Sequence, residues 1–273
     1  MKYVAVKAGK IVLVQKWTVL MFLLIAGTLV IASSSFAARP LVTDDSGTVG
    51  KGKFQAEFGV ESSSRKDKED DVEIKETETE LSGVFTYGVT DSIDMVVGFP
   101  YSWKKVKEDG ETVFDANRFS DVSMEVKWRF YEKDGLGFAL KPGVTLPTGN
   151  EEKGFGTGRM GYGLAFIASK EIDPFAFHFN AGYTLNDNKV EERKDIWAAS
   201  VAATFEAAKG LNLVGNIGVE RNADPEVQTA PAFALVGLNY SINDHIMLDA
   251  GFKFGLNKQE VDNAFIAGVT LNF

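Results

Sequence analysis

The chain has 273 residues, of which 45% are hydrophobic, and this is enough for one or two folded domains. It carries 29 basic and 38 acidic residues, and this negative balance argues against nucleic acid as a partner, because phosphates attract basic proteins. The chain has no cysteine and only two, widely separated, histidines, so neither a disulfide framework nor a zinc centre is expected. We therefore predict no cofactor and no metal.

The first 37 residues have the pattern of a secretory signal peptide. Four lysines and no acid precede an apolar run of about 16 residues, Trp17 to Ala32. Ser35 and Ala37 then fit the small-x-small rule for cleavage after Ala37. The alternative is a membrane anchor, but a spanning helix needs roughly 20 residues. We predict that residues 1–37 are removed on export to the cell outer membrane.

Beyond residue 50, alternation of apolar and polar residues indicates β-strands. In DVSMEVKWRFY, Asp121 to Tyr131, one face carries Val, Met, Val, Trp and Phe, and the other carries Ser, Glu, Lys and Arg. The same pattern marks twelve segments in all: 52–62, 76–88, 92–104, 120–131, 136–147, 160–170, 174–185, 195–207, 210–221, 230–241, 245–256 and 263–273. No segment after the signal peptide has an apolar run long enough for a transmembrane helix.

The connections between these segments alternate in length. Short turns occur near residues 90, 133, 172, 208 and 243, and longer polar connections occupy 63–75, 105–119, 148–159, 186–194, 222–229 and 257–262. Short turns on one rim and long loops on the other are typical of outer-membrane barrels. We predict an all-β fold, a transmembrane antiparallel up-and-down β-barrel of about 12 strands, formed by residues 51–273.

A soluble β-sandwich also alternates, but two features favour the barrel. The polar face is rich in small residues, as a lumen requires, and the apolar face has aromatic residues near the strand ends, as membrane interfaces favour. Pro100, Pro142 and Pro231 fall inside predicted strands and cannot donate ladder hydrogen bonds, so we expect bulges or strand ends there.

The stretch GFGTGRMGYG, Gly154 to Gly163, contains the G-x-G-x-x-G spacing of a dinucleotide-binding loop. Such a loop must be followed by a helix whose N-terminus faces the phosphates. The next residues, YGLAFIASK, alternate as a strand instead. We interpret these glycines as part of a long outer loop and of the start of the next strand.

Three stretches resemble a family of outer-membrane transporters assigned to the MetA pathway of phenol degradation. They are ARPLVTDDSGTVGKGKFQAEFGVE, FTYGVTDSIDMVVGFPY and LPTGNEEKGFGTGRMGYG, and the resemblance covers nearly the whole mature chain. It implies an outer-membrane barrel and suggests aromatic or other hydrophobic solutes. The C-terminal strand ending in Phe273 also resembles the signal read by the barrel assembly machinery.

Two polar segments lie before and after the first predicted strand. Residues 38–50, which contain TDDSGT, are interpreted as an N-terminal periplasmic or plug-like segment. The charged stretch Ser62–Glu80 is interpreted as a solvated surface hairpin, with cation binding among lipopolysaccharides as a weaker alternative.

Alternation also predicts which polar side chains face the lumen. The candidates are Glu57, Glu80, Asp94, Glu125, Lys127, Arg129, Lys141, His178, Asp249 and Lys253. These charges either pair across the lumen and brace a narrow barrel, or line a constriction that sets ion preference. The sequence leaves both readings open.

The pattern as a whole predicts an outer-membrane channel for passive passage of small solutes, with outer-membrane lipid and lipopolysaccharide around it. The first alternative is a closed structural or surface-interaction barrel. The second is an outer-membrane lipid hydrolase, which would need a Ser within hydrogen-bond reach of His178. No Ser on the same strand face forms an obvious motif with His178, so we predict that the protein is not an enzyme.

Overall fold

The computed structural model describes residues 39–69 and 71–273, so the predicted signal peptide lies outside the described residues. The described part contains one short 3-10 helix, η1 (Glu151–Lys153), and thirteen strands. The strands are β1 (Phe54–Glu69), β2 (Val72–Thr90), β3 (Ile93–Glu108), β4 (Glu111–Phe119), β5 (Val122–Lys133), β6 (Leu136–Leu146), β7 (Gly161–Ile172), β8 (Phe175–Leu185), β9 (Asp195–Ala208), β10 (Leu211–Glu220), β11 (Ala232–Asn243), β12 (Ile246–Gly255) and β13 (Asn263–Asn272). Among these described residues, no helix is both long and apolar enough to cross a membrane.

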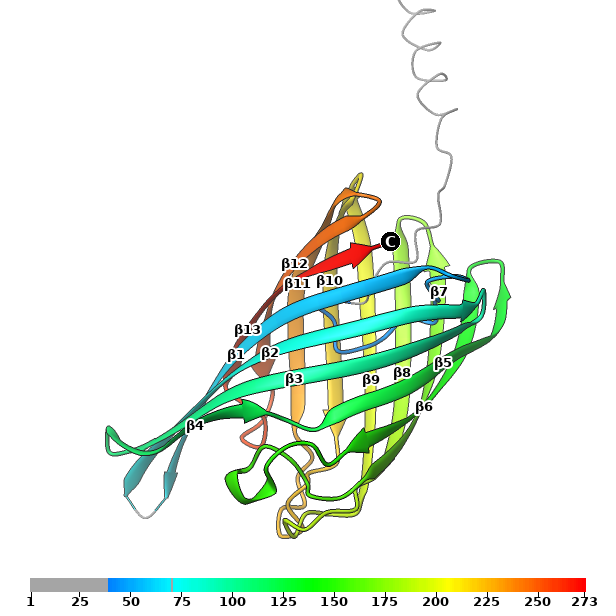
Figure 1. Cartoon of the computed structure of the whole chain (residues 1–273). Coiled ribbons are helices and arrows are strands. Elements are labelled where there is room, and N and C mark those ends of the chain that lie inside the picture. The colour runs from blue at the N-terminus through cyan, green and yellow to red at the C-terminus, as the bar shows by residue number, and fades with distance from the viewer. Residues whose placement is uncertain (1–38, 70) are drawn as a thin grey trace, which may run out of the picture. The chain divides into compact units, whose positions relative to one another are not determined.

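The strands close into one antiparallel barrel with twelve positions around its wall (Figure 1). β1 pairs with β13 on one side and with β2 on the other, which joins the two ends of the sheet. β4 and β5 pair with the same side of β3, along Tyr101–Glu108 and Ile93–Gly98 respectively, so they share one position. The predicted barrel of about 12 strands is confirmed.

The two rims of the barrel differ, as the connection lengths predict. Tight turns join β2 to β3, β5 to β6, β7 to β8, β9 to β10 and β11 to β12 at one rim, which we call the short-turn rim. The opposite rim, the long-loop rim, carries the connections before β7, β9, β11 and β13.

Two of the predicted polar connections are wrong, because they are paired strands and not loops. Residues 63–75 and 105–119 lie mostly in strands, because β1 and β2 pair as far as Glu69↔Val72 and β3 and β4 pair as far as Glu108↔Glu111. These paired extensions project beyond the long-loop rim (Figure 1). The sequence pattern missed them because ladder hydrogen bonds need no apolar side chains, and the outward positions in these stretches carry mostly polar residues.

The prolines lie at interruptions of the ladders, as expected. Pro100 lies between the part of β3 that pairs with β5 and the part that pairs with β4. Pro142 lies in a gap of the β5–β6 ladder between Glu125↔Gly143 and Trp128↔Leu140, and Pro231 precedes β11. At each of these positions the interrupted ladder does not need the N–H group that proline lacks.

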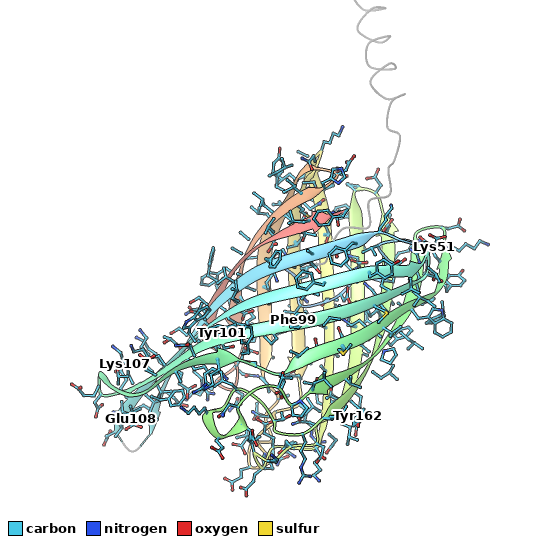
Figure 2. All side chains as sticks on the ribbon, viewed as in Figure 1. Lys51, Phe99, Tyr101, Lys107, Glu108 and Tyr162 are labelled. Atoms are coloured by element: carbon cyan, nitrogen blue, oxygen red, sulfur yellow. The ribbon has the colours of Figure 1, made fainter. Side chains whose placement is uncertain are left out.

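The outer wall is apolar and the interior is polar. Large exposed apolar side chains point outward all around the barrel, and aromatic residues among them gather toward both rims, such as Trp128 and Phe175 near the short-turn rim and Tyr162 and Trp197 near the other. Figure 2 shows Phe99 on this wall and Tyr162 near the long-loop rim. Soluble proteins bury apolar side chains and expose polar ones, and this barrel has the opposite arrangement. The apolar outer wall therefore lies in a bilayer.

A small apolar cluster lies on the inner face of the barrel. Val214, Leu235 and Ile266 are each almost fully buried, and Leu41 and Phe233 pack against them. Because Leu41 precedes the first strand, this cluster joins the N-terminal segment to the wall.

Candidate functional site

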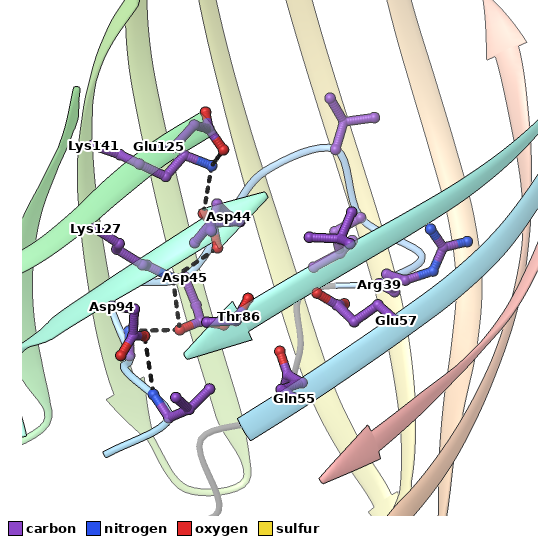
Figure 3. Close-up of a pocket in the computed structure, with 16 residues that line it drawn as sticks. Arg39, Asp44, Asp45, Gln55, Glu57, Thr86, Asp94, Glu125, Lys127 and Lys141 are labelled. Atoms are coloured by element: carbon purple, nitrogen blue, oxygen red, sulfur yellow. Dashed lines mark hydrogen bonds and ion pairs between the residues drawn. The ribbon is translucent and has the colours of Figure 1, made fainter. Parts of the chain in front are cut away.

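The lumen contains a cavity of about 250 Å³ lined by strand residues and by the N-terminal segment (Figure 3). Five of the predicted lumen residues line it: Glu57, Asp94, Glu125, Lys127 and Lys141. They come from β1, β3, β5 and β6, which belong to one continuous part of the wall, with β2 between β1 and β3. The inward positions of these four strands therefore form one charged face.

The other five predicted residues lie elsewhere. Asp249 contacts Arg39, and Lys253 contacts Glu61 at 2.9 Å and Glu260 at 3.7 Å. Arg129 pairs with Glu132 and donates to the carbonyl oxygen of Asp91 near the short-turn rim. The remaining two are Glu80, which accepts a hydrogen bond from Ser102, and His178, which contacts Ser169.

Residues 39–50, which we call the inner segment, run inside the barrel along its wall. Asp44 accepts from Lys127 at 2.9 Å and from Lys141 at 3.1 Å, and Lys141 also pairs with Glu125 at 3.4 Å. Figure 3 shows these four side chains pointing toward one another. Lys127 and Lys141 thus obtain their counter-charge largely from the inner segment, because ammonium groups that are mostly buried require a nearby anion.

Wall side chains also satisfy the backbone of the inner segment. Val42 and Thr43 donate their N–H groups to Asn216 Oδ1 at 2.8 and 3.1 Å, and Val49 donates to Asp94 Oδ2 at 3.0 Å. A segment without secondary structure can be buried only if its polar groups find such partners. The lumen therefore supplies hydrogen bonds that water supplies to an ordinary exposed loop.

Inward-facing glycines make room for the inner segment. An added Cβ at Gly59 or Gly268 would collide with the Arg39 side chain, and one at Gly237 would lie 2.8 Å from Pro40 Cγ. The wall is thus shaped to the segment at several points, in addition to holding it by charge.

The partners of the lumen lysines are what sequence reasoning missed. Alternation places Lys127 and Lys141 inward. It cannot show that Lys127 contacts Asp44, which lies 83 residues earlier in the chain. The adjacent acids Asp44 and Asp45, in an otherwise uncharged stretch, were the available signal. Such a pair in front of a barrel with inward lysines is a candidate counter-ion.

His178 has a serine neighbour, contrary to expectation. The Oγ of Ser169 lies 2.9 Å from His178 Nδ1 and also accepts a hydrogen bond from the N–H of Ser46 at 2.8 Å. The serine was overlooked because it lies on β7, opposite His178 of β8, and sequence proximity does not show cross-strand neighbours. Within the described residues, no carboxylate forms a hydrogen bond with the other ring nitrogen, and no group of three ligating side chains could hold a metal.

The glycine-rich stretch has the predicted structure. Gly161 begins β7, which is a strand and not a helix. The loop before it is held by Asp121, which accepts from the N–H groups of Gly149 and Thr157 at 2.8 Å each. Gly156 packs against the same carboxylate, and an added Cβ there would lie 2.5 Å from its Oδ1. The glycines therefore serve loop packing.

Solved structures with the same fold are membrane proteins. An outer membrane channel from Pseudomonas putida F1 is 14% identical, with a TM-score of 0.66 over 84% of this chain and 98% of that one. The translocator domain of the autotransporter NalP from Neisseria meningitidis (12% identity, TM-score 0.50, 82% and 89% coverage) and the NanC porin (12%, 0.50, 80% and 98%) are less similar. At these identities the likeness shows the barrel fold alone.

No curated protein matches the sequence. The family model described as "Putative MetA-pathway of phenol degradation" matches residues 37–273, which is nearly all of the chain. The resemblance carried by the glycine-rich loop and by the two other stretches is therefore confirmed. The chain is a β-barrel protein of the outer membrane, and it belongs to this family.

Proposed function

We propose that the protein is an outer-membrane channel for the passive passage of small solutes, in particular aromatic or other hydrophobic compounds. The observation that carries the proposal is a closed barrel with an apolar outer wall and a charged, hydrogen-bonding lumen. The family description and the related channel from Pseudomonas putida F1 support this assignment.

The inner segment acts as a plug in this proposal. Its ion pairs from Asp44 and Arg39 and its contact through Leu41 hold it against three parts of the wall. Solute passage through the lumen then requires the segment to shift, and the rate of passage depends on how firmly these contacts hold.

Flux into liposomes tests the proposal. The mature protein, residues 38–273, is compared with a barrel of residues 51–273 that lacks the inner segment, using phenol-like aromatic acids and sugars of similar size. We expect faster flux of the aromatics than of the sugars, and faster flux of both without the segment. No flux of either class through the folded shortened barrel contradicts a channel.

Export and assembly are part of the same proposal. Residues 1–37 direct the chain across the inner membrane and are cleaved, and the short-turn rim then faces the periplasm. Phe273, whose ring is exposed, follows the last strand, β13, and the barrel assembly machinery recognises it in this proposal. Lipopolysaccharide surrounds the opposite rim.

A closed structural barrel is the first alternative. It is favoured by the ion pairs of Glu125, Lys127, Lys141, Asp249 and Lys253. Against it, three lumen carboxylates, Glu57, Asp94 and Glu80, form no ion pair with the described residues. The negative charge of the lumen wall is therefore not fully compensated by these residues. Absence of flux in both forms of the protein would leave this alternative as the better account.

The contact between Ser169 and His178 favours a hydrolase as the second alternative. Against it, Ser169 Oγ already accepts from the inner segment, and a hydrolytic site also needs a group that orients the histidine. We propose that the pair is structural. Ester turnover that disappears in Ser169→Ala, with flux unchanged, would instead establish an enzyme.

A further inference from the structure

The extensions of β1 to β4 form a small sheet beyond the barrel. Pairing of β1 with β13 ends at Ser64↔Asn263, whereas pairing of β1 with β2 continues for five more residues. β3 and β4 add two further strands to this part of the sheet. One of its faces continues the outer wall and the other continues the lumen wall, since the register has no shift along β1 and β2 at this level.

Three lysines lie side by side on the outward face of this sheet. Lys66 of β1 is directly opposite Lys75 of β2, and Lys75 is directly opposite Lys107 of β3. Alternation from the exposed outward residues Phe58 and Trp103 puts all three on the outer face. We call these three residues the lysine row, and Figure 2 shows Lys107 on the extension.

The lysine row has no ion pair with the described residues, although neighbouring lysines do. Lys105 pairs with Asp115 at 2.8 Å, and Lys68 pairs with Asp71 at 2.8 Å. Like charges directly opposite each other in a sheet are destabilising, so the row lacks an internal structural reason. An anion from outside the chain would remove this repulsion.

Charge is sorted between the two faces of β2. Lys75, Thr77 and Thr79 alternate with Glu76, Glu78 and Glu80, so the acids face the lumen side. Glu78 pairs with Lys104, also on that side. On the outward face of β2, the acid nearest to Lys75 is Glu73, two residues farther from the barrel. The lysine row itself therefore carries only positive charge.

The lysine row continues the membrane-facing surface. Going outward along the sheet, the apolar wall ends with Leu81, Tyr101 and Phe119, and Tyr101 contacts the rings of Trp103 and Phe119. At the next level Trp103 of β3 lies opposite Thr79 of β2, and Thr79 Oγ1 is 3.1 Å from Ser62 Oγ of β1. The lysine row lies four residues farther along the strands, and Lys107 is thus about 13 Å from Trp103 along β3.

We propose that the lysine row binds the phosphate groups of an anionic lipid in the outer leaflet. Aromatic side chains mark the interface between hydrocarbon and headgroups, so the row lies at the depth of lipid phosphates. Its Cα atoms span roughly 10 Å across three strands, which suits one bisphosphorylated headgroup or two adjacent phosphates. The acyl chains of the same lipid pack on the apolar wall below the row.

This inference rests on the proposed orientation, in which the short-turn rim faces the periplasm, but not on transport. Each lysine near an anionic lipid surface contributes about fivefold to binding, so the row contributes about 100-fold. The acids Glu73 and Asp115 reduce this figure where they approach the headgroup.

Binding of a defined lipid to the purified, folded protein tests the inference. The probes are bisphosphorylated lipid A, the same lipid with its phosphates removed, and inorganic phosphate as a competitor, each added to protein in neutral detergent. The variants are Lys66→Gln/Lys75→Gln/Lys107→Gln and the control Lys51→Gln/Lys133→Gln/Lys209→Gln. The control makes the same change of charge at the short-turn rim, where Figure 2 shows Lys51.

We expect the phosphorylated lipid to bind at least tenfold more tightly than the dephosphorylated one, and the row variant to lose this preference while the control keeps it. Equal binding of the two lipids, or unchanged binding by the row variant, overturns the inference. Competition by millimolar inorganic phosphate alone would also overturn it, since the site would then be a free-phosphate site. Solute flux is measured on the same preparations, so a failed channel and a failed lipid site are distinguished.

Discussion

At the scale of single residues, Asp44 has the largest share of the charge contacts between the inner segment and the wall. Its carboxylate contacts two lysines from two different strands, Lys127 of β5 and Lys141 of β6. Both lysine side chains are largely buried, at 10% and 19% exposure. Removing the anion therefore leaves two ammonium groups with reduced compensation.

Asp44→Asn should release the inner segment from this part of the wall. We expect the free energy of unfolding to fall by about 1–3 kcal/mol, less than for a fully buried pair because water reaches the site, and we expect single-channel conductance to rise. Denaturant unfolding and planar-bilayer recordings measure the two effects. Asp71→Asn is the matched control, since that side chain is 95% exposed on the distant hairpin. Unchanged conductance in Asp44→Asn would mean that these ion pairs do not hold the plug.

At the scale of elements, the β1–β2 extension is separable from the barrel. Beyond Ser64, β1 no longer pairs with β13, and the N–H of Lys66, which donates to Asp262 Oδ2 at 2.8 Å, is the last hydrogen bond recorded between the described residues of the extension and this side of the seam. The extension is nonetheless a regular ladder, which ends with Glu69 opposite Val72. Its polar composition suits a sheet with both faces outside the hydrocarbon.

Shortening this hairpin should leave the barrel intact. Replacing residues 66–75 with Asn-Gly joins the opposite residues Arg65 and Glu76 through a favoured two-residue turn. We expect the heat-modifiable band on a gel and the β-sheet circular dichroism to match the full-length protein. Binding of phosphorylated lipid A should weaken strongly, because the replacement removes Lys66 and Lys75 of the lysine row and leaves only Lys107.

A contrasting deletion defines where the barrel begins. Removing Val60–Glu61 together with Glu80–Leu81 deletes residues in the part of β1 that pairs with β13. This change shifts only the part of β1 after Gly59 by two positions against β13, which brings the polar Ser62 to the outward place of Val60, and it should lower the yield of the compact, heat-modifiable form. If the hairpin replacement also lowered this yield, the extension would be part of the folding unit.

At the scale of the whole molecule, closure depends on a seam between residues that are far apart in the chain. Phe54 donates its N–H to the carbonyl of Phe273 at 3.1 Å, and Phe273 donates to the carbonyl of Phe54 at 2.8 Å. Their rings are 6.1 Å apart on the outer wall. Ten register pairs between β1 and β13 continue the seam.

Phe273→Ala should affect assembly in cells more than stability. The backbone hydrogen bonds of the seam remain, and the ring is 68% exposed, so we expect a loss of only about 1 kcal/mol in refolded protein. The yield of folded barrel in the outer membrane should fall clearly, because the terminal ring is the proposed assembly signal. Phe265→Ala removes an outward ring from the same strand, 51% exposed, and should keep the normal yield. Equal yields from both variants would contradict the proposed signal.

The sequence by itself determined the fold and the direction of the side chains. Alternation with period two shows which residues face the bilayer, because successive strand side chains point to opposite faces. It also placed Lys127, Lys141 and Asp94 on the inner face, where they line the cavity. The unequal connections indicated an outer-membrane barrel without any structural information.

Only the tertiary structure decided which side chains meet. Asp44 and Lys127, Ser169 and His178, and the three lysines of the row come together through strand register or through the path of the inner segment. Register depends on turn lengths and on hydrogen bonds summed around the closed barrel, and local patterns do not contain it. The inner segment has no periodicity, so its place in the lumen follows from the wall it fits, with its glycine gaps and buried partners.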